Sequence, residues 1–103
     1  MRLRLSSLAV SDLREIHAHT VTHWGHGQAD RYLNQLWDEL DKINEAPERG
    51  ILRDDLPMGC RMCAAAKHVI FFRLHADRVE IARILHSSMD FPRHLPPDLM
   101  GNS

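Results

Sequence analysis

The feature that most constrains this chain is a helical stripe of apolar residues running from about Gln28 to Ala46. Its apolar side chains recur at three- and four-residue spacing, which places them on one face of a helix. They are Ala29, Leu33, Leu36, Leu40 and Ile43, broadened by Tyr32 and Trp37. Pro47 ends this helix, because proline cannot continue the backbone hydrogen-bond ladder. A helix with one broad apolar face needs a second layer to cover it, so the stripe predicts a layered domain.

A first amphipathic helix precedes this stripe. Ser6 or Ser7 can cap its N-terminus, and Gly25 stops it because glycine adopts the left-handed conformation found at helix C-termini. Its regularly spaced positions are Ala9, Leu13, Ile16, Thr20 and Trp24. Because the link between the two helices is very short, we expect them to lie antiparallel as a hairpin.

Most of the remaining chain has the pattern of β-strands. Residues 2–5, RLRL, alternate basic and apolar side chains, which indicates a short strand with one buried face. Residues 47–59 carry two prolines and two glycines and are predicted to form a loop. Three runs rich in Val, Ile and Phe then predict an antiparallel meander. These runs are CRMCAAA (60–66), KHVIFFRLHA (67–76) and RVEIARILH (78–86).

The predicted order is β-α-α-β-β-β, an α+β domain in which a helix hairpin packs on an antiparallel sheet. The last two strand runs are almost continuously apolar, so we expect that part of the sheet to be covered on both faces. The proline-rich segment after residue 86 predicts at most one short C-terminal helical turn. We therefore expect residues 1–95 to form a single domain and residues 96–103 to be a flexible tail.

Composition excludes several classes of protein. The 103 residues suit one domain, and a net charge of −1 argues against a protein that coats nucleic acid electrostatically. The start of the chain lacks the apolar run of a secretory signal. Apolar stretches are also too short for a membrane helix. We expect a reduced, cytoplasmic protein that has no membrane contact.

Histidines between residues 17 and 26 raise the question of a metal site, because His19, His23 and His26 share one helical stripe. No HExxH motif accompanies them. Cys60 and Cys63 lie on a predicted strand, where residues three apart point to opposite faces. We therefore interpret the histidines as surface or half-buried helix residues and the cysteines as small apolar strand residues, with no metal and no cofactor. A nucleophilic Cys–His pair is a weaker hypothesis, because nothing in the sequence selects the partner.

An ordered set of segments resembles the ParE toxins of the RelE/ParE superfamily of type II toxin–antitoxin systems. The segments are DLREI (12–16), WGHGQADRYLNQL (24–36), PERG (47–50), RDDL (53–56), GCR (59–61), KHVIFFR (67–73) and VEIARILHSSMDFPRHL (79–95). The resemblance covers residues 2–95 and implies the same β-α-α-β-β-β fold. It also implies a toxin that binds and poisons DNA gyrase and is neutralised by a ParD-type antitoxin. Operator DNA would be contacted only through that antitoxin.

The chain departs from the usual family pattern at several positions. Ile51 stands where an arginine commonly follows the loop glycine, and Ala66 stands where glycine or asparagine is common. The CAAA strand has smaller side chains than usual, and His17 and His19 replace aromatic residues. The small CAAA strand and Ile51 keep open an inactive module that binds its antitoxin and represses the operon without poisoning a cell.

A second alternative is a RelE-like, ribosome-dependent mRNA endonuclease. That branch of the superfamily is strongly basic and typically carries a C-terminal tyrosine, and its chemistry needs cations beside the phosphate. This chain is slightly acidic, and its lysines are Lys42 and Lys67 alone. Its single tyrosine, Tyr32, belongs to the second helix stripe, where packing is expected rather than catalysis. We therefore favour a toxin that acts by binding and predict no catalytic residue.

Two sets of contact residues are predicted. The target-binding set combines strand arginines with the polar ending of the chain: Arg61, Arg73, Arg83, His86, Met89, Asp90, Arg93 and His94. Alternatively, Arg83 and Asp90 pair with one another for structural reasons, and Met89 and Leu95 close the core. The antitoxin-binding set lies on the second helix: Tyr32, Leu33, Leu36, Trp37 and Leu40. Trp37 is either an anchor for the partner or a residue packed on the sheet.

Overall fold

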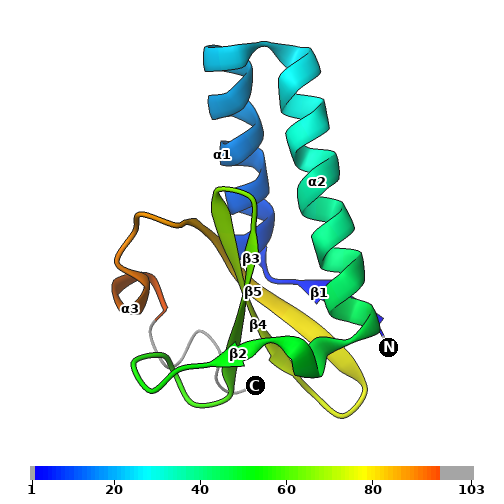
Figure 1. Cartoon of the computed structure of the whole chain (residues 1–103), viewed down its shortest axis with the longest axis vertical. Coiled ribbons are helices and arrows are strands. Elements are labelled where there is room, and N and C mark those ends of the chain that lie inside the picture. The colour runs from blue at the N-terminus through cyan, green and yellow to red at the C-terminus, as the bar shows by residue number, and fades with distance from the viewer. Residues whose placement is uncertain (1, 96–103) are drawn as a thin grey trace.

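The computed structural model describes residues 2–95, so the predicted tail at 96–103 lies outside the described residues. Three helices and five strands, with one turn of 3-10 helix, make up the described chain (Figure 1). In order they are β1 (Arg2–Leu5), α1 (Ser7–Trp24), α2 (His26–Glu45), η1 (Pro47–Arg49), β2 (Ile51–Leu52), β3 (Cys60–Ala65), β4 (His68–Leu74), β5 (Arg78–His86) and α3 (Phe91–His94). The predicted α+β class and the single short C-terminal helical turn are confirmed.

The strands form one sheet in the order β1-β5-β4-β3-β2. β1 runs parallel to β5, and all other neighbours are antiparallel. β2 was not predicted. It lies inside the predicted loop at 47–59 and consists of two exposed residues, so it has neither the length nor the burial alternation that marks a strand in sequence.

The helix hairpin forms as expected, with α1 and α2 side by side and their turn at the far end from the sheet (Figure 1). Ser6 caps α1: its Oγ accepts a hydrogen bond from the Ala9 N–H at 3.0 Å. Gly25 alone makes the turn at φ +88°, a backbone conformation that side chains disfavour. Because one residue suffices, α2 begins at His26, two residues before the predicted start at Gln28.

Both faces of the sheet are covered, which confirms the prediction from the apolar strand runs. The helix-side cluster joins α1 and α2 to one face; its buried members are Ala9, Leu13, Ile16, Leu36, Leu40, Ile43, Ala65, Ile70, Phe72, Val79, Ile81 and Ile84. The far-side cluster covers the other face with the loop before β3 and the C-terminal turn; its buried members are Leu56, Cys60, Val69, Phe71, Ala82, Leu85 and Leu95. Cys60 belongs to the far-side cluster and Cys63 packs against the helix-side cluster, so the two cysteines do face opposite ways.

β5 contains a β-bulge immediately before Arg83. Phe71 pairs with Arg83 and Phe72 with Ile81, so Ala82 is an extra residue with no partner on β4. The extra residue lets Ile81 and Ile84 both face the helix-side cluster although they are three positions apart. None of the described helices is both long and apolar enough to cross a membrane.

Candidate functional site

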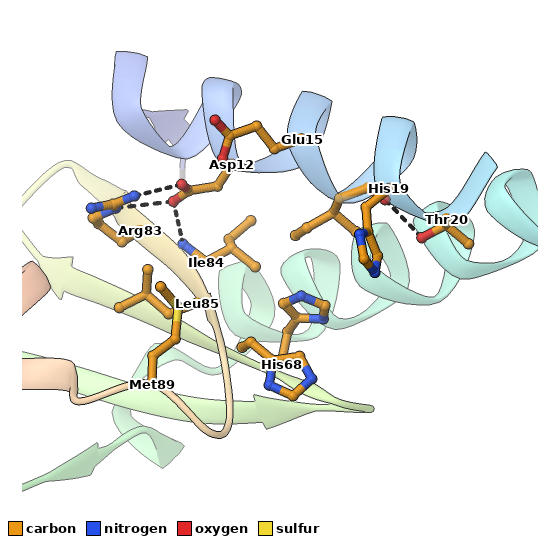
Figure 2. A pocket seen from close by; sticks show the side chains of 11 residues that line it. Asp12, Glu15, His19, Thr20, His68, Arg83, Ile84, Leu85 and Met89 are labelled. Atoms are coloured by element: carbon orange, nitrogen blue, oxygen red, sulfur yellow. Dashed lines mark hydrogen bonds and ion pairs between the residues drawn. The ribbon is translucent and has the colours of Figure 1, made fainter. Parts of the chain in front are cut away.

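A hollow of about 360 Å³ opens between α1 and the C-terminal end of β5 (Figure 2). Its walls come from α1, from the start of β4 and from the chain that leaves β5; they include Glu15, His19, His68, Arg83, His86 and Met89. A second hollow of about 350 Å³ continues toward the helix turn and shares His19, Thr20, His68 and His86 with the first. The continuous depression therefore runs beside the predicted target-binding residues His86 and Met89.

A buried ion pair lies at one end of this hollow. Asp12 of α1 is only 5% exposed, and Arg83 donates to it twice, from Nη2 to Oδ1 at 2.7 Å and from Nε to Oδ2 at 3.1 Å. The bonds from Asp12 raise the pKa of Arg83, which keeps the guanidinium charged. Such a bidentate pair holds both side chains in one geometry.

Asp12 also completes the edge of the sheet. β1 ends at Leu5 opposite Ile81, and Ser6 extends this edge by bonding the carbonyls of Ile81 and Ala82. Past that point, none of the strands within residues 2–95 lies beside β5 on this side. The Ile84 N–H donates to Asp12 Oδ2 at 2.9 Å, so a side chain takes the place of a strand.

Sequence reasoning missed Asp12, although a signal was present. Asp12 stands between Ala9 and Ile16 at three- and four-residue spacing, on the buried face of α1 beside Leu13. A carboxylate inside an apolar stripe predicts a buried cationic partner, because burying an unpaired charge is very costly. The alternative that paired Arg83 with Asp90 is wrong: Arg83 binds Asp12, and Asp90 Oδ2 lies 3.9 Å from Arg93 Nε.

The C-terminal segment, residues 86–94, carries most of the predicted target-binding side chains. His86, Met89, Asp90 and Arg93 are exposed, and His94 is half-buried. Apolar side chains hold the segment against the far-side cluster. Phe91 packs edge-on against Phe71, with ring centroids 4.9 Å apart, and the neighbouring Leu95 is fully buried in the far-side cluster. Core closure by Leu95 is thus confirmed, whereas Met89 lines the hollow with more than a third of its surface exposed.

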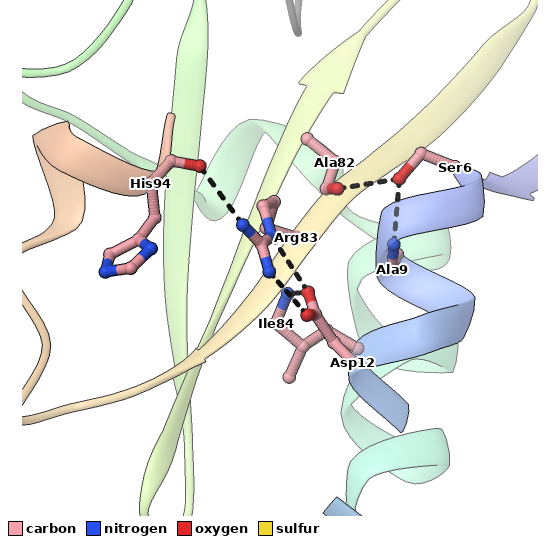
Figure 3. A network of polar contacts seen from close by, with 7 residues as sticks. All are labelled: Ser6, Ala9, Asp12, Ala82, Arg83, Ile84 and His94. Atoms are coloured by element: carbon pink, nitrogen blue, oxygen red, sulfur yellow. Dashed lines mark hydrogen bonds and ion pairs between the residues drawn. The ribbon is translucent and has the colours of Figure 1, made fainter. Parts of the chain in front are cut away.

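The other two predicted arginines are not brought together. Arg61 pairs with Phe72 in the sheet register and so lies on the helix side, where its Nη1 donates to the carbonyls of Glu48 and Gly50 at 3.3 and 3.2 Å. Arg73 pairs with Cys60 and so lies on the opposite face, that of the far-side cluster. Arg83 contacts the C-terminal segment, with Nη1 donating to the His94 carbonyl at 3.5 Å (Figure 3).

A neutral polar pair borders the second hollow. The Tyr32 hydroxyl accepts from the Lys67 N–H at 3.0 Å and shares a hydrogen bond with His68 Nδ1 at 2.7 Å. Burial, followed by the nearby His86, lowers the pKa of His68 to about 4, and the ring is therefore neutral at pH 7. Tyr32 thus ties α2 to the β3–β4 turn, and its hydroxyl is already engaged by the protein.

The predicted antitoxin-binding residues divide into two groups. Leu36 and Leu40 are fully buried in the helix-side cluster, so the prediction that they contact a partner directly does not fit this structure. They face the sheet because they lie at the centre of the apolar stripe. Tyr32 and Leu33 are half-buried, and Trp37 is 42% exposed at the edge of the stripe. Part of the Trp37 side chain is therefore accessible to a partner.

The histidines that suggested a metal site are spread along the hairpin. His17 Nε2 lies 3.2 Å from Asp30 Oδ1, linking α1 to α2, and His23 Nδ1 donates to the carbonyl of His19 at 2.9 Å. Among residues 2–95, no group of three or more His, Cys, Asp or Glu is placed to hold a metal ion. Burial raises the pKa of Cys60 to about 11, which keeps this thiol protonated and unreactive at pH 7.

Comparison with known proteins places these features in a family. The sequence model described as ParE toxin of the type II toxin–antitoxin system parDE matches residues 3–91. A protein named toxin ParE1 from Caulobacter vibrioides is 40% identical over 92 residues, which cover 89% of this chain and 95% of that protein. A toxin ParE1 from Mycobacterium tuberculosis is 34% identical over 95 residues, covering 91% and 97%.

A solved structure shares the fold. It is titled as the chromosomal ParDE toxin–antitoxin system from P. aeruginosa, and it matches with a TM-score of 0.75, covering 84% of this chain and 95% of that one. At 22% identity this likeness shows the fold alone. The family match over residues 3–91 and the identities to two ParE1 toxins go further: this chain belongs to the ParE toxin family of type II toxin–antitoxin systems.

Proposed function

We propose that this toxin inhibits DNA gyrase by binding to it, and that a ParD-type antitoxin neutralises it. The observation that carries the proposal is the family match across residues 3–91, nearly all of the described chain. Gyrase and a newly made antitoxin are both met in the cytoplasm, where we expect the protein to act. The geometry adds a candidate surface for each partner, on different parts of the molecule.

The C-terminal segment is the proposed gyrase contact. It displays exposed His86, Met89, Asp90 and Arg93 on a short turn, while Phe91 beneath them fixes the turn to the sheet. Binding residues are often carried by loops held on a rigid scaffold, and this segment has that form. The adjoining hollow of about 360 Å³ offers a concave place for a gyrase side chain.

The helix hairpin is the proposed antitoxin surface. Trp37, with Tyr32 and Leu33 beside it, offers partly exposed apolar area along one edge of α2. An amphipathic segment that folds on binding could cover this edge, since such segments lay an apolar face into a groove. The similar solved fold is titled as a ParDE system, which supports an antitoxin of the ParD type.

Action by binding alone, without catalysis, is favoured by the local chemistry. RNA cleavage of the RelE type needs cationic side chains that stabilise phosphate charge. Lys42 forms a surface pair with Glu39 at 3.3 Å on α2, and the Tyr32 hydroxyl, which a catalytic role would need, is engaged by the Lys67 backbone and His68.

Purified gyrase provides the test. The wild-type chain should inhibit supercoiling of relaxed plasmid and cause cleaved DNA to accumulate. Preincubation with its ParD-type antitoxin should abolish both effects. Full supercoiling in the presence of excess folded protein would reject gyrase as the target. Induction in cells without the antitoxin then separates the remaining readings, because an inactive antitoxin-binding module would leave growth unchanged.

A further inference from the structure

We propose that Arg83 is a positioning residue for the C-terminal segment, and that the buried carboxylate of Asp12 holds it in that role. The consequence for gyrase binding rests on the proposed function, whereas the effect on the segment itself does not. Figure 3 shows the arrangement, with Arg83 between Asp12 on α1 and His94 on α3.

The helix-side half of this link is rigid. Asp12 accepts three hydrogen bonds, two from the Arg83 guanidinium and one from the Ile84 N–H at 2.9 Å. Its side chain is almost entirely buried, so water does not compete for these bonds. The guanidinium is therefore held in one orientation relative to both α1 and β5.

The other half of the link reaches the end of α3. This helix is a single turn, Phe91–His94, so its last carbonyls have no intrahelical partner. Arg83 Nη1 donates to the His94 carbonyl at 3.5 Å, and a positive charge at a helix C-terminus is favourable. The bond is long, so charge attraction contributes more to it than ideal hydrogen-bond geometry.

Apolar contacts alone do not define where the segment sits. Phe91 and Leu95 hold it against the far-side cluster, but apolar contacts are not directional and resist sliding poorly. On the other side, the hollow separates α1 from the stretch that carries His86 and Met89. At its start the segment has a directional contact, because the Ser87 N–H donates to the Lys67 carbonyl at 3.0 Å. At its far end, a planar guanidinium fixed by a carboxylate supplies a directional contact through the His94 carbonyl.

The nature of the side chain matters. Arginine has enough N–H groups to bind Asp12 twice and still donate to the His94 carbonyl. A lysine carries one compact charge and cannot reproduce the planar fork. We therefore expect Arg83→Lys to hold the segment less well than arginine and better than an uncharged residue.

Amide hydrogen exchange provides the main test, because it reports the segment directly and needs no gyrase. The test variant is the double change Asp12→Asn with Arg83→Met, which removes both charges and leaves an oxygen that can accept from Ile84. The control is Arg78→Met, the same change on the same strand at an arginine paired with its neighbour Asp77.

In the double variant, exchange of the hydrogen-bonded amides of Met89, Arg93 and Leu95 should speed up by about tenfold, the effect of losing roughly one charge-assisted hydrogen bond. Slowly exchanging amides of α2 and β4 should be unchanged, and Arg78→Met should match the wild type throughout. Unchanged exchange at the three amides of a folded double variant would overturn the proposal.

The functional test compares the effect of the double variant on gyrase inhibition with its effect on antitoxin affinity. The double variant should need about tenfold more protein than the wild type to inhibit gyrase, while its affinity for the antitoxin stays within about threefold. A loosened segment with undiminished gyrase inhibition would overturn the role of Arg83 in target contact. If the wild type itself does not inhibit gyrase, the proposed function fails, and the exchange result still decides whether Arg83 positions the segment.

Discussion

The Asp12–Arg83 ion pair and the Tyr32–His68 hydrogen bond both connect a helix to the sheet, and we call each of them a tie. The two ties differ in charge and in position. Asp12 of α1 binds Arg83 of β5 as an ion pair, 71 positions apart in sequence. Tyr32 of α2 binds His68 at 2.7 Å as a neutral pair and accepts from Lys67 in the β3–β4 turn. Arg83 of the ion pair also contacts the C-terminal segment, whereas Tyr32 of the neutral pair contacts the turn between β3 and β4.

Because of this difference, we expect the ion pair to matter for target binding and the neutral pair to be the one that acid weakens. Arg83 donates to the His94 carbonyl, so we expect the ion pair to influence both stability and the proposed gyrase contact. The neutral pair contains an uncharged imidazole, and protonation of His68 places a positive charge in a half-buried position beside His86, so acid destabilises this contact region.

The largest effect should come from removing one half of the ion pair. Arg83→Met leaves the buried Asp12 carboxylate without its cation, and the free energy of unfolding should fall by about 3–5 kcal/mol. Adding Asp12→Asn should restore a large part of that loss, because the uncompensated buried charge is then removed. Urea unfolding of the two single variants and the double variant measures this coupling, and additive losses would show that the two residues do not act as a pair.

The second effect is a pH dependence of the neutral tie. Its cause is a His68 pKa of about 4 in the folded protein against an ordinary value of 6.5. Between these values the unfolded chain binds more protons, so stability is complete above pH 6.5 and falls as the pH drops toward 4. Because His68 is only half-buried, we expect a loss of about 1–2 kcal/mol between pH 7 and pH 5 after allowance for solvent screening.

The groups near His68 set the control for this pH dependence. His86 and His19 oppose its protonation and Asp12 favours it. His68→Asn should flatten the stability profile between pH 7 and pH 5, while the matched change His26→Gln, at an exposed histidine, should leave it as in the wild type. An unaltered slope in His68→Asn would assign the acid sensitivity to other residues.

A smaller effect should come from the tyrosine side of the same tie. Tyr32→Phe keeps the ring that packs on the helix-side cluster but leaves the Lys67 N–H and His68 Nδ1 without their partner. Stability should fall by about 1–1.5 kcal/mol, the usual contribution of a partly buried hydrogen bond. Thermal unfolding measures it. A loss as large as that of Arg83→Met would erase the distinction between the two ties.

The smallest effect concerns the turn that carries the neutral tie. Ala66 has φ +57°, a left-handed conformation that is unfavourable for alanine and is adopted more readily by glycine. Ala66→Gly should raise the free energy of unfolding by about 0.5–1 kcal/mol, the strain relief being partly offset by greater freedom of the unfolded chain. Denaturant unfolding checks the sign, and a loss of stability would mean that alanine is unstrained here.

Periodicity made most of the fold predictable from sequence. The stripe of α2 and the apolar strands β4 and β5 are long enough for spacing and composition to identify them. β2 has two residues and forms only by pairing with β3, so its existence depends on tertiary structure. The start of α2 at His26 depended on a one-residue turn at Gly25, which the spacing of apolar residues does not specify.

The candidate site was predictable only in part. The C-terminal segment was identified by its density of polar residues, and the structure leaves most of it exposed. The partner of Arg83 was not identified, because Asp12 is distant in sequence and approaches only when α1 packs on β5. Arg61 and Arg73 looked equivalent in sequence, yet the strand register places them on opposite faces.

The most direct test of the central claim is one titration of gyrase supercoiling with three folded proteins: wild type, Arg93→Ala with His94→Ala, and Trp37→Ala. The C-terminal segment is proposed as the gyrase contact, so the double variant should lose inhibition by at least about tenfold. Trp37→Ala should inhibit as the wild type does and should instead be rescued poorly by the antitoxin. Equal inhibition by all three proteins, or loss confined to Trp37→Ala, would contradict the assignment of gyrase binding to the C-terminal segment.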